Sequence, residues 1–93
     1  MGIRITSHAV GPGLAVSVLG TLDGAACRLL TEEVRGASVE SLVLDVAGLV
    51  GLDEAGASLL RALRAGGASI EHASPYIALR LAPDMGSERH RAP

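Results

Sequence analysis

The chain offers little reactive chemistry, because it contains no lysine and only one cysteine, Cys27. The lack of lysine excludes mechanisms that need a side-chain amine, and the single cysteine excludes an internal disulfide and a thiolate metal cluster. Phenylalanine and tryptophan are also absent, so Tyr76 is the only aromatic residue apart from the histidines. A core without aromatic rings must be built from Leu, Val, Ile and Ala, which predicts thin helices packed close to a sheet.

Two further absences concern the surroundings of the chain. No apolar run approaches the roughly 20 residues of a membrane helix, and the N-terminus lacks the basic-then-apolar pattern of a secretion signal. The net charge of −2 provides no general attraction to nucleic acid. We therefore expect a cytoplasmic protein that neither enters a membrane nor binds nucleic acid.

The first third of the chain predicts a β-hairpin followed by a helix. Residues 3–10 and 14–19 alternate between apolar and polar, and Gly11-Pro12-Gly13 between them predicts a three-residue loop. Residues 20–24 break the alternation, and Asp23 is a candidate helix cap. Apolar residues then recur with a helical period over 25–35, and Gly36 follows as a typical helix end.

The remainder predicts alternating strands and helices. Residues 42–46 form a short apolar run typical of an interior parallel strand. Asp53 and Glu54 then precede a helix that Gly66-Gly67 closes, and residues 68–72 predict another strand. Ser74-Pro75 is a favourable start for a third helix, and Pro83 would end it.

This order, β-β-α-β-α-β-α, predicts an α/β fold with a small mixed sheet of about four strands and helices packed mainly on one face. The 93 residues suffice for one domain with a single core. We expect that domain to cover residues 1–82. Residues 83–93 have no periodicity and predict a disordered C-terminal tail.

A motif in the middle of the chain carries a family resemblance. Leu44-Asp45 is followed by Leu52-Asp53-Glu54-Ala55-Gly56 and a leucine-rich helical pattern, and Gly20-Thr21-Leu22-Asp23 lies upstream. With these motifs, over roughly residues 3–81, the chain resembles the STAS domains of bacterial anti-sigma factor antagonists. The family pattern has Asp-Ser-Ser-Gly where this chain has 53–56. The resemblance implies a STAS-like fold and a protein-interaction role.

Two departures from the family pattern bear on function. The second serine of the family motif is the phosphorylation target, and that position here is Ala55. The first serine is replaced by Glu54. Because Ala55 has no hydroxyl group, we expect the usual serine phosphoswitch to be absent. Family members also continue into another strand and helix, whereas only about a dozen unpatterned residues follow Leu81 in this chain.

The resemblance assigns partner binding to the turn and helix over residues 53–64, and the candidate residues are Asp53, Glu54, Ala55, Gly56, Ser58 and Arg61. Each of them also has a structural interpretation. Asp53 is most simply an N-cap that accepts from the backbone of Ala55 or Gly56, with a partner contact as the alternative. Glu54 suits a first helical turn because of the helix dipole, and as a phosphate mimic it would point about 100° away from position 55.

The other candidates divide in the same way. Gly56 permits close packing against the sheet or, alternatively, close approach of a partner. Ser58 is an ordinary surface serine or a displaced phosphorylation site. Arg61 and Arg64 continue the exposed face, where they are solvated or bind the carboxylates of a partner.

No pattern in the sequence predicts an enzyme, a cofactor or a metal site. His8, Cys27 and His72 fall on separate elements and match no nucleophile–base motif. Asp45, Asp53 and Glu54 are residue types found in carboxylate metal sites, but Asp45 is better interpreted as part of the hydrogen bonding at a strand end. The Gly11-Pro12-Gly13 turn lacks the residues of a phosphate-binding loop.

Three functions follow from the resemblance. The first is a non-catalytic antagonist that binds an anti-sigma factor or serine kinase without being switched by phosphorylation. The second is a small STAS subunit that binds the ATPase of a bacterial lipid-transport ABC complex. The third is a domain that senses a nucleotide or another small ligand. A four-stranded sheet also has two edges, so we expect a homodimer or a partner that covers one of them.

Overall fold

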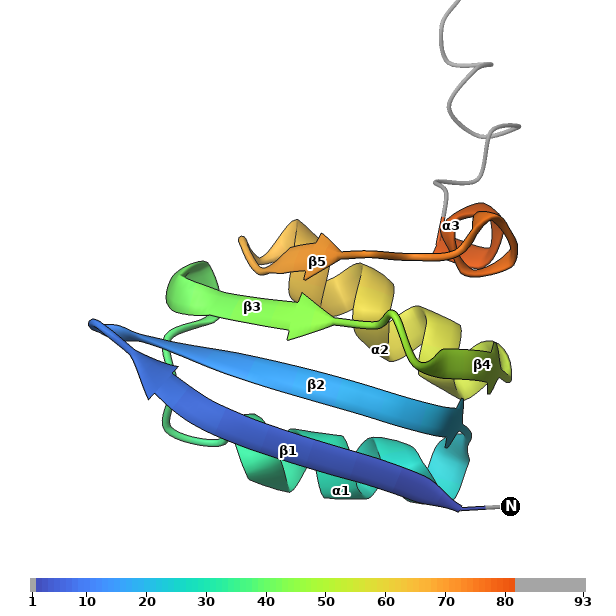
Figure 1. Cartoon of the computed structure of the whole chain (residues 1–93), viewed down its shortest axis with the longest axis horizontal. Coiled ribbons are helices and arrows are strands. Elements are labelled where there is room, and N and C mark those ends of the chain that lie inside the picture. The colour runs from blue at the N-terminus through green and yellow to red at the C-terminus, as the bar shows by residue number, and fades with distance from the viewer. Residues whose placement is uncertain (1, 82–93) are drawn as a thin grey trace, which may run out of the picture.

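The computed structural model describes residues 2–81, which form one mixed sheet and three α-helices (Figure 1). The elements in chain order are β1 (Ile3–Val10), β2 (Gly13–Leu22), α1 (Gly24–Val34), a single 3₁₀ turn (Val39–Ser41), β3 (Leu42–Asp45), β4 (Leu49–Leu52), α2 (Glu54–Ala65), β5 (Ser69–Glu71) and α3 (Pro75–Leu81). The predicted α/β architecture is therefore confirmed. The expected tail at 83–93 lies outside the described residues.

The sheet is built around β2, its longest strand. β1 pairs with β2 in antiparallel orientation, whereas β3 and β4 both pair with β2 in parallel, and β5 continues the sheet beside β3. β3 lies against residues 14–17 of β2 and β4 against residues 20–22, so the two short strands occupy successive parts of the same side of β2. Figure 1 shows them one behind the other along β2.

The prediction of about four strands missed β4, which was expected to be a loop. Apolar and polar residues do not alternate in β4 because one extra residue interrupts its pairing with β2. The register shifts between Gly20 and Thr21 of β2. Val50, opposite this shift, is 73% exposed. Gly48 and Gly51 also give this stretch a loop-like composition. Leu49 and Leu52 are nevertheless buried, and they bring β4 into the core.

The hairpin also differs from the prediction. Val10 pairs directly with Gly13, so the loop has two residues rather than three. Gly11 has a φ of 57°, and Pro12 is restricted to φ near −65°. A positive φ followed by a negative one is the pattern of a type II′ turn, which joins antiparallel strands without splaying them. β2 also runs through to Leu22 instead of ending at residue 19.

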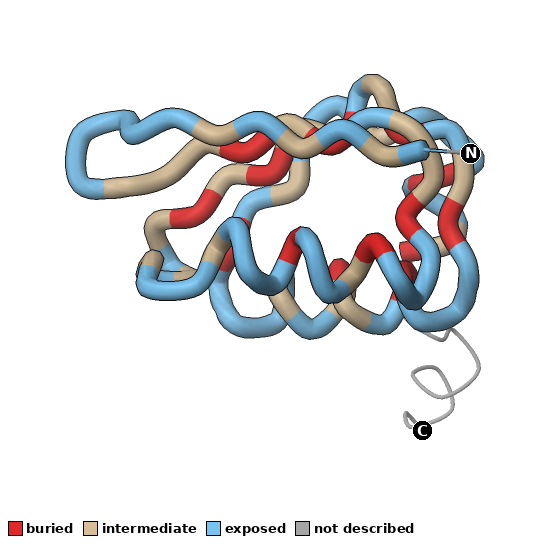
Figure 2. The backbone as a smooth tube through the Cα atoms, turned by 90° about the horizontal axis from the view of Figure 1, so that it is seen from below, coloured by how far each residue is buried: buried red, intermediate tan, exposed pale blue. Residues whose placement is uncertain are grey.

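The core lies between one face of the sheet and the helices, as the sequence predicts. Figure 2 shows α1 and α2 on the same side of the sheet, with the buried positions facing inward between the two layers. The buried side chains of the described region are all apolar, and they come from every strand except β1 and β5 and from all three α-helices. The largest fully enclosed ones are Val16, Val18, Leu22, Leu30, Leu42, Leu44, Val46, Leu60, Ile77 and Leu81.

Candidate functional site

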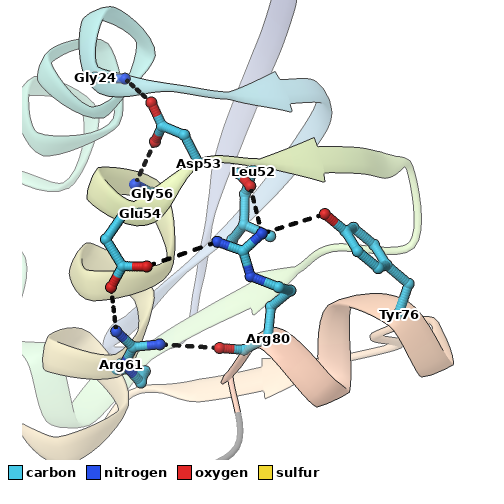
Figure 3. Close-up of polar contacts among 8 residues, drawn as sticks. All are labelled: Gly24, Leu52, Asp53, Glu54, Gly56, Arg61, Tyr76 and Arg80. Atoms are coloured by element: carbon cyan, nitrogen blue, oxygen red, sulfur yellow. Dashed lines mark hydrogen bonds and ion pairs between the residues drawn. The ribbon is translucent and has the colours of Figure 1, made fainter.

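Asp53 holds the N-termini of two helices together. Its Oδ1 accepts a hydrogen bond from the backbone N–H of Gly56 at 2.9 Å, so Asp53 is the N-cap of α2, as the sequence predicts. Its Oδ2 accepts from the N–H of Gly24 in the first turn of α1, at 3.1 Å (Figure 3). Both carboxylate oxygens are thus used within the chain, and α1 and α2 are fixed next to each other at this end.

Asp23 has the simpler role that the sequence assigns to it. It is the N-cap of α1, and its Oδ1 accepts from the N–H of Ala26 at 2.9 Å. Cys27 lies one residue further along α1 and is half-buried. Burial raises the pKa of its thiol, and the charges of Asp53 and Asp23 raise it further, so the thiolate that a nucleophile requires is disfavoured.

Gly56 is buried because α2 starts in direct contact with the end of β2. A Cβ atom at this position would lie 2.2 Å from the carbonyl oxygen of Leu22. The contact is with backbone, which has little freedom to move because the N–H of Asp53 donates to the same carbonyl at 3.3 Å. Of the two interpretations of Gly56, close packing against the sheet is the one for which the structure provides a contact.

Glu54 lies between two arginines. Its carboxylate is 3.1 Å from the guanidinium of Arg61 and 3.8 Å from that of Arg80 on α3 (Figure 3). Arg80 also donates to the carbonyl oxygen of Leu52 at 3.1 Å and to the Tyr76 hydroxyl at 3.3 Å. Glu54 is therefore an exposed carboxylate whose charge is balanced within the chain, and this balance does not favour its interpretation as a permanent phosphate mimic.

The two arginines of α2 turn toward α3. Arg61 donates to the carbonyl oxygen of Arg80 at 2.9 Å, and Arg64 donates to that of Leu81. These carbonyls end α3, where backbone acceptors have no partner inside the helix. Arg61 is 34% exposed and Arg64 is exposed, so both lie partly at the surface but are held by contacts within the chain rather than free in solvent. Both guanidinium groups are engaged within the chain.

Beside Glu54, α2 also exposes a row of small residues. Ala55 and Ser58 are exposed, and Ala62, one turn beyond Ser58, is exposed as well. Because residues three and four apart lie on one face of a helix, these three side chains form a single stripe. We call Ala55, Ser58 and Ala62 the α2 stripe. It runs beside the Glu54–Arg61–Arg80 contacts and carries no charge.

Sequence reasoning missed Arg80, which fixes α3 against the turn, and Tyr76, whose hydroxyl accepts from Arg80 within α3. Their spacing of four residues places them on one face of a predicted helix, but nothing in the sequence indicates which element that face contacts. Gly24 was missed as well, since its contribution is a backbone N–H. The sequence predicted that Asp53 caps α2. It could not reveal that the same carboxylate also accepts a hydrogen bond from α1.

Asp45 lies elsewhere, at the end of β3. It accepts from the N–H of Ala47 at 3.0 Å, and its Oδ1 is 3.2 Å from Nδ1 of His72. The Ala47 hydrogen bond and, to a smaller extent, His72 lower the pKa of the Asp45 carboxyl. This confirms that Asp45 takes part in strand-end hydrogen bonding. Within residues 2–81, no three His, Cys, Asp or Glu side chains are grouped so that they could hold a metal.

Replacing Asp53 with alanine is expected to lower the free energy of unfolding by about 2 kcal/mol, because α2 loses its N-cap, worth about 1 kcal/mol, and the Gly24 N–H of α1 loses its acceptor, worth about as much. Asp53→Asn should cost about half as much, since an amide can accept from Gly56 while its NH₂ group cannot accept from Gly24. Urea denaturation followed by circular dichroism measures both values. Asp23→Asn is the control, because the carboxylate of Asp23 binds one helix only; equal losses for the two asparagine variants would contradict the hydrogen bond from Gly24 to Asp53.

Comparison with known proteins gives a likeness of fold. No protein-family model and no curated protein sequence matches the chain. Among the described helices, none is long and apolar enough to cross a membrane. An uncharacterized protein of the DUF3478 family from Shewanella loihica PV-4, described as having a SpoIIAA-like fold, aligns with a TM-score of 0.46 and 20% identity, over 74% of this chain and 66% of that one. The crystal structure of a protein called Mglu aligns with a TM-score of 0.58 and 16% identity. The alignment covers 71% of this chain but only 19% of Mglu, so the two proteins share a fold over that part.

Proposed function

We propose that the chain is a non-catalytic regulatory module of the anti-sigma factor antagonist type, which acts in the bacterial cytoplasm and binds a protein partner through residues 53–64. The observation that carries the proposal is the α2 stripe. Small side chains let a partner approach a helix backbone closely, and the neighbouring charged groups already have partners within the chain. A surface of this kind binds without first having to break its own ion pairs.

The setting of the stripe adds to its suitability as a docking site. Asp53 fixes the start of α2 against α1, and Arg61 and Arg80 fix it against α3. A surface that is held in place before binding loses less conformational entropy when the partner arrives. In the family that this chain resembles, a phosphate on the residue at position 55 controls docking. Ala55 has no hydroxyl group, so we propose that binding is constitutive.

A photo-crosslinking amino acid placed at Ser58 and expressed in the native host tests this proposal. We expect it to form a covalent adduct with one protein, identified by mass spectrometry as an anti-sigma factor or a serine kinase. Thr31 is the matched control, since it is an exposed residue of α1 outside residues 53–64. No adduct at Ser58, or the same adducts from both positions, would contradict a partner surface on α2.

The identity of the partner separates the two interaction roles. An adduct with a transporter ATPase would assign the chain to a lipid-transport complex, a role that the missing hydroxyl of Ala55 also suits. The ligand-sensing alternative requires no adduct. It would instead give a rise in melting temperature with one member of a nucleotide panel.

A further inference from the structure

The edge strand β1 is unusually regular for a strand with only one neighbour. All eight of its residues pair with β2 in an unbroken register from Ile3–Gly20 to Val10–Gly13. Within residues 2–81 no other strand pairs with it, and Figure 1 shows it forming one border of the sheet. Natural proteins usually protect such an edge with proline, a bulge or a charge that points inward. β1 has no proline, no bulge and no acidic or basic side chain on its helix-facing side.

The hydrogen bonding shows which backbone groups of β1 are available. Thr21 donates to the carbonyl oxygen of Gly2 at 3.4 Å. Because bonded and non-bonded pairs alternate in an antiparallel ladder, the even-numbered residues of β1 bond to β2. The N–H and C=O groups of Ile3, Ile5, Ser7 and Ala9 therefore point away from the sheet. They present four donor and acceptor pairs to an incoming strand.

A groove runs beside these groups, between β1 and α1. It has a volume of about 300 Å³ and is lined by Ile3, Ile5, Leu29, Glu32 and Glu33. Ile3 and Ile5 provide an apolar floor that the helix leaves partly open, and Leu29 is 55% exposed at its rim. A strand added next to β1 would direct every second side chain into this groove.

The charges at the groove specify the kind of side chain that fits. Glu32 is paired with Arg35 at 2.5 Å, whereas Glu33 forms no ion pair within the described residues. The Ser7 hydroxyl donates to Glu33 and holds its carboxylate next to β1. The basic residues of β1, Arg4 and His8, lie on the opposite face of the strand by alternation. The groove therefore carries uncompensated negative charge above an apolar floor.

We propose that β1 and this groove form a second interaction site, which binds an extended segment of a partner protein by strand addition. Every second side chain of the segment enters the groove, and these side chains are apolar or basic. The backbone of the segment pairs with the odd-numbered residues of β1. This site lies on the β1–α1 side of the molecule and shares no residue with the α2 stripe. An experiment that disproves binding at one surface therefore leaves the proposal for the other intact.

A synthetic peptide tests the site with the full chain. In the probe, threonine occupies every second position and valine and arginine share the others, and the control peptide has glutamate in place of arginine. We expect fluorescence polarisation to show binding of the arginine peptide that weakens with added salt, and at least tenfold weaker binding of the glutamate peptide. Equal binding of the two peptides would overturn the proposal.

Two variants of one residue isolate the role of the backbone. Ser7→Pro removes an outward N–H without breaking the ladder to β2, a position where an edge strand tolerates proline. It should weaken peptide binding at least tenfold, whereas Ser7→Ala, which loses only the hydroxyl, should stay within about threefold of the wild type. Unchanged binding by a folded Ser7→Pro variant would exclude strand addition.

Two further measurements complete the test. Glu33→Lys changes an exposed position and leaves the edge intact, so it provides an answer even if Ser7→Pro does not fold. It should reverse the preference toward the glutamate peptide, and an unaltered preference would overturn the proposal. Sedimentation velocity then tests whether the strand that pairs with β1 comes from a second copy of the chain. If the wild type were a dimer and Ser7→Pro a monomer, β1 would pair with its own copy, and the proposal of a basic segment from another protein would be contradicted.

Discussion

Gly56→Ala is expected to lower the free energy of unfolding by about 2–3 kcal/mol, the upper part of the range for overpacking a close contact. An alanine Cβ would lie 2.2 Å from the Leu22 carbonyl oxygen, which is far inside van der Waals contact. Relief requires α2 to move away from β2, and this would disturb the Asp53 cap and its bond to Gly24. The better helix propensity of alanine, about 1 kcal/mol, offsets only part of this cost.

Urea denaturation measured by circular dichroism gives the change, and Gly24→Ala is the matched control. Gly24 also lies in the first turn of a helix, but an added Cβ there has no atom within 4 Å. We expect Gly24→Ala to be neutral or slightly stabilising. If the two variants were equally stable, α2 and β2 would not be in the close contact described above.

Leu44→Ala is expected to have the largest effect on stability, about 3 kcal/mol within the usual 2–5 kcal/mol for such a substitution. Leu44 is fully buried in β3, between β2 and β5 and beneath the helices. The surrounding core contains no aromatic side chain that could turn into the cavity. Against a total stability of roughly 5–14 kcal/mol, this loss would leave a substantially less stable domain.

Leu79→Ala provides the comparison for Leu44→Ala, because Leu79 is 74% exposed on α3. The same side-chain truncation there should change the free energy of unfolding by less than about 0.5 kcal/mol, as is usual at the surface. Similar losses for the two variants would contradict the assignment of Leu44 to the core.

The sequence predicted the helices well because each has strong end signals. Asp23 and Asp53 cap α1 and α2, and Ser74 caps α3 by accepting from the N–H of Ile77 at 3.2 Å. Gly36 follows α1 with a φ of 89°. Such signals act over a few residues, so they can be read locally. The buried strand β3 was equally clear from its continuous apolar run.

What the sequence could not predict depends on contacts between distant segments. β4 exists because residues 49–52 reach the end of β2, and its extra residue hides the alternation that would have revealed it. The inward turn of Arg61 depends on where the carbonyls at the end of α3 lie, 19 residues further along the chain. For the same reason, the sequence could not reveal that Asp53, besides capping α2, also accepts a hydrogen bond from α1.

The central claim is that the exposed surface around Ala55 binds a protein partner and remains permanently in the unphosphorylated form. Calorimetric titration with the partner captured from Ser58 tests it most directly, with Ala55→Glu compared with Ala55→Gln. Both side chains suit an exposed first turn and are similar in size, so they differ mainly in charge. We predict that Ala55→Glu weakens binding at least tenfold relative to Ala55→Gln. Equal affinities of wild type, Ala55→Gln and Ala55→Glu would contradict the claim.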